Sequence, residues 1–116
     1  MRFDKLAFGS IRVDGITYDH DLVVDRGKVR RRKKKPSRKF QEQFGHTPLS
    51  VEEELPWKCS QLVIGTGAYG RLPIMQEVRR EAERLGIKLL ILPTRDAIDV
   101  LNRDMEGRNA VLHLTC

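Results

Sequence analysis

Three short apolar runs alternate with two amphipathic stretches in the second half of the chain, and this alternation limits the folds open to it. The runs at 61–64, 87–92 and 110–115 are too short for helices and apolar almost throughout, as are strands buried on both faces of a sheet. In the two intervening stretches, 73–85 and 94–105, apolar residues recur at helical spacing. The pattern predicts two crossover units around a largely parallel three-stranded core.

The first half of the chain predicts antiparallel hairpins. Ile11–Val13 and Ile16–Tyr18 flank Asp14-Gly15, a dipeptide that suits a two-residue hairpin turn. A second, looser hairpin is expected within residues 22–32, and the resulting meander should pack against the parallel sheet or extend it. We therefore expect a single α/β domain over residues 1–116, with a βαβαβ C-terminal half and an antiparallel β-hairpin N-terminal half.

Two shorter motifs predict helix in the middle of the chain. Phe40 and Phe44 lie one helical turn apart, which favours one or two turns of helix in residues 37–45 with both rings as core anchors. Ser50 and Glu53 match a capping box, so we expect about two helical turns before the next proline.

The positive charge of the chain is concentrated in one basic segment. The net charge is +6, but residues 26–39 hold ten of the 22 Lys and Arg residues and no acid, so the other 12 basic residues face 16 acidic ones. Lysines on an edge strand discourage pairing with other sheets, and we expect residues 28–35 to form such a strand and run into a loop. The alternative is attraction of nucleic acid through Arg30, Arg31, Arg32, Lys33, Lys34 and Lys35. Since the run has no aromatic residue for base stacking, we expect no specific recognition of nucleic acid.

A glycine-rich loop between a predicted strand and a predicted helix is the first candidate binding site. Residues 65–70 match G-x-G-x-x-G, but the helix begins too late for a dinucleotide pyrophosphate and no acid follows the next strand for a ribose. Two alternatives stay open, a tight turn with positive φ angles or a loop that binds some other anion, with Arg71 as its clamp. The candidate ligand-binding residues are Gly65, Thr66, Gly67, Tyr69, Gly70 and Arg71.

The histidines and cysteines complete no catalytic or metal-binding motif. His113 lies in the last predicted strand and Cys116 three residues on, so a regular strand would point their side chains to opposite faces. His46 lies in a turn and can approach either one only through the fold. In Asp19-His20-Asp21, strand alternation sends His20 away from both carboxylates. We expect no metal, no cofactor and no complete set of catalytic residues.

The composition favours a cytoplasmic location without membrane insertion. The chain has no run of about 18 apolar residues. Met1–Lys5 lacks the apolar centre of a secretion signal. Cys59 and Cys116 form neither a CxxC pair nor a spaced framework, which suits a reducing compartment.

Four separated pieces of the sequence follow the order and spacing of a known family: Gly9–Tyr18, Gly45–Pro48, Val63–Gly67 and His113–Cys116. The chain resembles the small domain of unknown function that archaeal and bacterial proteins share with the vertebrate adipogenesis-associated protein and a mitochondrial assembly factor of respiratory complex I. The resemblance implies a three-layer α/β fold with a mixed central sheet. It marks Gly65, Gly67, His46, His113 and Cys116 as motif positions without roles, and it implies no catalytic mechanism.

These observations support three hypotheses of function. The first is a non-enzymatic binding or assembly module with a protein partner, alone or as a homo-oligomer, because no catalytic constellation is complete. The second is a binder of, or an enzyme acting on, a small anionic ligand such as a phosphate or carboxylate at Gly65–Arg71. The third and weakest is a nucleic-acid accessory protein that works through Arg30–Lys35.

Overall fold

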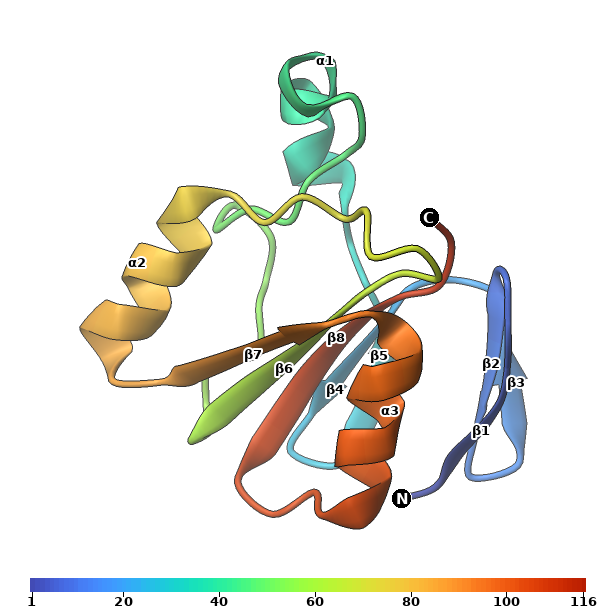
Figure 1. Ribbon diagram of the computed structural model, residues 1–116. Helices are drawn as coiled ribbons and strands as arrows, with labels where there is room; N and C mark the ends of the chain where they lie inside the picture. Colours follow the sequence, from blue (N-terminus) through green and yellow to red (C-terminus); the bar gives the residue numbers. More distant parts are fainter.

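A five-stranded mixed sheet runs through the middle of the protein, and a smaller three-stranded antiparallel sheet lies beside it (Figure 1). The computed structural model describes all residues 1–116. In spatial order the large sheet consists of β5 (Lys28–Arg31), β4 (Leu22–Asp25), β8 (Arg108–His113), β6 (Gln61–Thr66) and β7 (Lys88–Leu92). The small sheet consists of β1 (Phe3–Ala7), β2 (Ser10–Val13) and β3 (Ile16–Tyr18).

The C-terminal half has the predicted βαβαβ arrangement. Strand β6 pairs in parallel with both β7 and β8, and the crossovers are α2 (Gln76–Leu85) and α3 (Thr94–Arg103). Helix α2 begins three residues later than expected, because the chain before it is extended and Met75 donates its N–H to the carbonyl of Leu49. The last strand is shifted in the opposite sense, because β8 begins and ends two residues before the expected 110–115, and residues 114–116 lie beyond it.

The large sheet separates two hydrophobic cores, which gives the domain its three layers. Alternate residues of β6 point to opposite faces, with Val63 in one core and Leu62 and Ile64 in the other. Helix α3 and the small sheet cover the first face, and α2 with residues 49–55 covers the second. Because both faces are buried, the middle residues of the central strands are apolar on both faces, as the sequence pattern indicates.

Both hairpins of the N-terminal half form. The Asp14-Gly15 turn joins β2 to β3, and a tight Arg26-Gly27 turn joins β4 to β5. Strand β4 pairs with β8 antiparallel and so extends the parallel core into a mixed sheet. Strand β1, which the sequence pattern does not reveal, pairs with β2 and brings Phe3 into the core under α3.

The short helical segment expected in residues 37–45 forms, but the expected role of Phe40 and Phe44 as core anchors and the helix expected after Ser50 are both wrong. Phe40 and Phe44 are only half-buried, at the ends of a 3₁₀ helix η1 (Lys35–Phe40) and a four-residue helix α1 (Gln41–Phe44) that projects from the body of the domain (Figure 1). No helix follows Ser50, which lies in a turn. Both rings therefore contribute less to the core than their spacing suggests, and the side chains of Ser50 and Glu53 are free for other contacts.

Polar residues lie where β6 and β8 begin. Asn109 is buried, accepts the N–H of Arg26 and donates to the carbonyls of Pro56 (3.0 Å) and Lys58 (3.2 Å). Next to it, Arg108 donates to the side chain of Gln61 at 2.7 Å. These bonds tie the start of both strands to the neighbouring loops.

No helix in the structure combines the length and the apolar character that a membrane crossing requires.

Candidate functional site

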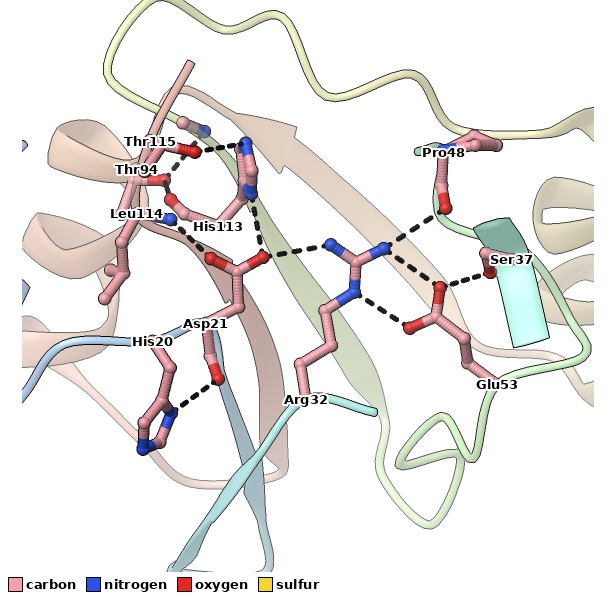
Figure 2. A network of polar contacts seen from close by, with 11 residues as sticks. His20, Asp21, Arg32, Ser37, Pro48, Glu53, Thr94, His113, Leu114 and Thr115 are labelled. Carbon is pink, nitrogen blue, oxygen red and sulfur yellow. Dashed lines mark hydrogen bonds and ion pairs between the residues drawn. The ribbon is translucent and has the colours of Figure 1, made fainter. Parts of the chain in front are cut away.

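A buried ion-pair network connects the strands to the middle segment of the chain (Figure 2). Its centre is Arg32, the residue after β5, whose side chain is 1% exposed. Its guanidinium donates to both carboxylate oxygens of Glu53 (2.8 and 2.9 Å), to Asp21 (3.0 Å) and to the carbonyl of Pro48 (3.1 Å). Burial alone would lower the pKa of Arg32, but the hydrogen bonds and charges of the two carboxylates raise it. The guanidinium is therefore a fixed positive charge that fastens three segments together.

Asp21 links this arginine to the end of β8. Its carboxylate accepts a hydrogen bond from Nδ1 of His113 at 2.8 Å and from the backbone N–H of Leu114 at 2.9 Å. Burial alone would raise the pKa of Asp21, but the hydrogen bond and charge of His113, the Leu114 amide and the Arg32 charge together lower it to about 2. Asp21 is thus a stable anion at neutral pH that holds the His113 ring in one orientation.

The other end of the network explains why the capping-box prediction fails. Ser37 donates to Glu53 at 2.5 Å, and the hydroxyls of Ser37 and Ser50 lie 2.6 Å apart. The Glu53 carboxylate therefore faces Arg32 and Ser37 and does not return to cap a helix at Ser50. Ser37 is the only buried residue of η1, so this contact anchors the helical segment to the sheet.

A cleft of about 170 Å³ beside the network brings the separated motif positions together. His46, Arg71, His113 and Cys116 all line it. The remaining lining residues are Arg32, Lys34, Gln41, Gly45, Thr47, Leu72 and Thr115. No Asp or Glu side chain lines the cleft, and neither Arg71 nor Lys34 forms an ion pair. The side chains that line the cleft therefore carry net positive charge, and two of the cations have no ion-pair partner.

The glycine-rich loop, whose last residue Arg71 lines this cleft, donates backbone hydrogen bonds to the last residues of the chain. The N–H groups of Ala68, Tyr69 and Arg71 donate to the carbonyls of Thr115 and Cys116 at 2.7 to 3.1 Å. Gly67 has φ +105°, and a Cβ there would lie 2.6 Å from the Thr115 carbonyl oxygen. The glycine permits this close approach, and these three amides are occupied by the chain itself.

A buried hydroxyl fixes the loop to the strand ends. Thr94, the first residue of α3, accepts the N–H of Gly67 at 2.8 Å and donates to the carbonyl of His113 at 2.5 Å. Among the loop residues proposed from the sequence, Gly65 packs against Thr94, and Thr66 donates to the Leu92 carbonyl. The glycines and Thr66 are thus engaged in the fold, and the side chains of Tyr69 and Arg71 are exposed.

The basic segment divides into one buried residue and several exposed ones. Strand β5 is an edge strand, as predicted, and Arg30 donates to the carbonyl of Glu54. Arg32 has to be removed from the cations of the nucleic-acid alternative, because it is buried and its charge is neutralised inside the protein. Arg31, Lys33, Lys34, Lys35 and Arg38 are exposed and line a groove of about 590 Å³.

His20 lies in the bend between β3 and β4, so the strand alternation expected at residues 19–21 is absent, although the His20 ring does point away from the Asp21 carboxylate (Figure 2). Its Nδ1 contacts the Asp21 carbonyl at 3.1 Å, and its ring lies edge-on to Tyr18. No group of three or more His, Cys, Asp or Glu side chains is arranged to hold a metal ion.

Nothing in the sequence groups Asp21, Arg32, Ser37 and Glu53. The one local pattern that includes a residue of the network is Ser50 followed three residues later by Glu53, and this pattern is also that of a helix capping box. What brings them together is the pairing of β4 with β8, because that pairing sets Asp21 beside His113.

The fold places the protein in the class of small three-layer α/β domains, and in this chain a buried ion-pair network lies beside a cleft at the strand ends. Residues 3–115 match the family described as protein of unknown function (DUF498/DUF598), and the chain belongs to this family.

Solved structures share the fold along the whole chain. The conserved hypothetical protein PH1505 from Pyrococcus horikoshii OT3 is 26% identical, with a TM-score of 0.82 and 100% of both chains covered. A protein designated MT938 is also 26% identical, with a TM-score of 0.74, 99% of this chain and 98% of that chain. A Bartonella henselae protein described as an outer membrane protein shares the fold at 14% identity, with a TM-score of 0.67, 98% of this chain and 94% of that chain. No curated protein matches the chain.

Proposed function

We propose that this protein is a non-enzymatic binding module that holds an anionic group, a phosphate or a carboxylate, in the cleft between the glycine-rich loop and α1. The observation that carries the proposal is the pair of free cations, Arg71 and Lys34, in a cleft that no Asp or Glu side chain lines. An arginine guanidinium can hold such a group through two parallel hydrogen bonds, and a nearby lysine adds charge.

The surroundings of His113 favour binding over catalysis. Its Nδ1 is held by Asp21, and its Nε2 lies 3.3 Å from the Thr115 hydroxyl. Asp21, His113 and the Thr115 hydroxyl thus follow the order of acid, base and hydroxyl in a serine-protease triad. Such a reaction would also need hydrogen-bond donors for an oxyanion, but the loop amides nearest the cleft already donate to Thr115 and Cys116. The histidine is therefore best understood as part of the cleft wall, with its orientation fixed.

The size of the cleft limits what enters it. At about 170 Å³ it is smaller than the roughly 300 to 1,000 Å³ of sites that enclose a whole small-molecule ligand. It suits one charged group that projects from a larger partner. We place this function in the cytoplasm, the compartment that the spacing of Cys59 and Cys116 favours.

A second candidate is an assembly module for a protein partner. The sequence resemblance to the vertebrate adipogenesis-associated protein and to the mitochondrial assembly factor of respiratory complex I supports it. The favouring observation is Tyr69, an exposed aromatic residue beside Arg71, because Tyr and Arg are enriched where proteins bind one another. The anionic group would then be an acidic side chain of the partner.

The test is ligand-induced stabilisation with inorganic phosphate as the probe. The melting temperature is measured at increasing phosphate, with sodium chloride adjusted to keep the ionic strength constant. Phosphate above its dissociation constant should raise the melting temperature of the unmodified protein by a few degrees, roughly. Arg71→Ala should abolish the shift. Arg79→Ala, which removes an exposed arginine from α2 outside the cleft, should leave it unchanged.

Two results would contradict the proposal. One is no stabilisation of the unmodified protein by phosphate, with the same result for acetate as a carboxylate probe. The other is an equal loss of stabilisation in Arg71→Ala and Arg79→Ala, which would show that the anion acts on the overall charge and not at the cleft.

A further inference from the structure

A row of exposed cations leads away from the cleft. Arg31, Lys33, Lys34, Lys35 and Arg38 line the groove of about 590 Å³, and none of them forms an ion pair. Asp21 is buried and paired with Arg32, so Asp19 is the one exposed carboxylate that lines the groove. Such a surface suits a ligand that carries several negative charges in succession.

The groove and the cleft form one continuous surface. Arg32, Lys34 and Thr115 line both, so the cleft lies at one end of the row of cations. Arg71, which comes from the glycine-rich loop and not from the basic segment, also lines the cleft and adds a sixth free cation to the same surface. A chain-like anion could therefore enter the cleft with one charged group and continue along the groove with the next.

Two exposed aromatic rings border this surface and come from parts of the sequence far from the basic segment. Phe8, at the β1–β2 turn, is 59% exposed, and Tyr69, in the glycine-rich loop, is 68% exposed. Their ring centroids lie 6.2 Å apart, and the Arg71 guanidinium lies 5.7 Å from the centre of the Tyr69 ring. Gly9, the neighbour of Phe8, lines the groove itself. Large exposed rings of this kind offer flat faces on which a base can stack.

We propose that this surface binds single-stranded nucleic acid, with backbone phosphates along the cleft and groove and a base stacked at Phe8 and Tyr69. The proposal rests on the proposed function, because the first phosphate occupies the anion cleft. The basic segment contains no aromatic residue, and the fold supplies the missing rings from two other segments. A positive groove combined with aromatic platforms is how proteins bind single strands, whereas an acidic peptide would use the cations but would gain nothing from stacking.

The experiment measures binding of a fluorescein-labelled 12-nucleotide oligouridylate by fluorescence anisotropy over a range of salt concentrations. If six cations contact phosphates, log Kobs should fall with log salt at a slope of about −4. Lys33→Gln/Lys35→Gln/Arg38→Gln leaves Lys34 and Arg71 in the cleft and should reduce that slope by about 2. The matched control, Arg79→Gln/Arg80→Gln/Lys88→Gln, removes three exposed charges outside the groove and the cleft and should leave the slope unchanged.

Stacking is tested separately from charge. Tyr69→Leu keeps a bulky apolar side chain but removes the aromatic ring on which a base could stack. It should weaken binding by roughly fivefold to a hundredfold and leave the slope of log Kobs against log salt unchanged. Circular dichroism confirms that each variant is folded, which the exposure of the replaced side chains favours.

Four results would overturn the proposal. These are no binding at low salt, an equal loss of binding in the control triple variant, equally tight binding of a duplex, and full competition by polyglutamate with no effect of Tyr69→Leu. The last would identify an acidic protein as the partner. If the oligonucleotide does not bind but phosphate still stabilises the protein through Arg71, this inference fails while the proposed function stands.

Discussion

Replacing Arg32 with methionine tests whether the buried network holds the domain together. Arg32→Met keeps much of the side-chain volume and removes the guanidinium, which makes four hydrogen bonds to Glu53, Asp21 and Pro48. The carboxylates left behind are nearly inaccessible, with side-chain exposures of 2% for Glu53 and 9% for Asp21. An uncompensated buried charge is the main consequence of the substitution.

The expected loss is large for a single substitution. Removing one partner of a buried ion pair typically lowers the free energy of unfolding by about 3 to 5 kcal/mol. Asp21 keeps its bonds to His113 and Leu114, and Glu53 keeps its bond to Ser37, so we expect a value toward the lower end of this range. Most of it is the penalty of leaving carboxylates unpaired, so Arg32→Met/Glu53→Gln should lose less than the sum of its two single variants.

The assay is urea denaturation at pH 7, followed by circular dichroism. Arg12→Met is the matched control, because Arg12 forms its ion pair with Asp4 at the surface, where such pairs contribute about 1 kcal/mol or less. The reasoning would be refuted if Arg32→Met cost no more than Arg12→Met, or if the double variant lost the full sum.

Three further predictions concern the groups around the cleft. The fold lowers the pKa of Asp21 from 3.8 to about 2, so on acidification the unfolded chain takes up this proton before the folded protein does. About 2 kcal/mol of the free energy of unfolding should therefore be lost as the pH falls from about 4 to 2. An acid titration of Asp21→Asn should lack this loss. Gly67→Ala should destabilise the protein by about 3 kcal/mol or more in urea, because its Cβ meets the terminal carbonyls, whereas Gly27→Ala, at a similar positive φ but in open space, should cost about 1 kcal/mol. Thr94→Val leaves the Gly67 N–H unpaired and should cost about 1 to 3 kcal/mol, with faster hydrogen exchange at that amide as the measurement that distinguishes it from a packing defect.

The regular elements of the C-terminal half could be predicted because their signals are local. Apolar runs at 61–64 and 87–92 and the helical spacing between them are properties of neighbouring residues, and the structure confirms both strands and the helix. The start of α2 could not be predicted, because the residues before it are held extended by Leu49, which lies more than 20 residues earlier in the chain. Long-range pairing overrides local preference there.

The residues of the site likewise divide into those that a local motif marks and those that only contacts between distant segments bring together. His46, His113 and Cys116 could be marked as motif positions, but their convergence on one cleft depends on the fold. Arg32 looks like any other member of the basic run, and only its distant partners Asp21 and Glu53 make it a buried residue. A one-dimensional charge pattern cannot rank those cations by burial, because burial depends on where the counter-charges lie.

The polar residues at the start of β6 and β8 have a consequence for how the chain finds its native pairing. A strand with one apolar face is aligned by its hydrophobic pattern, since a slip of one residue turns that face toward water. Strands β6 and β8 are apolar on both faces, so a slip would still bury hydrophobic side chains and would be tolerated by the two cores. The bonds of Asn109 to Arg26, Pro56 and Lys58 can form in only one alignment, as can the bond between Arg108 and Gln61. These side chains therefore fix the register of β6 and β8. The alignment of the central sheet depends on a few polar contacts at the start of these strands as well as on the apolar residues that fill the two cores.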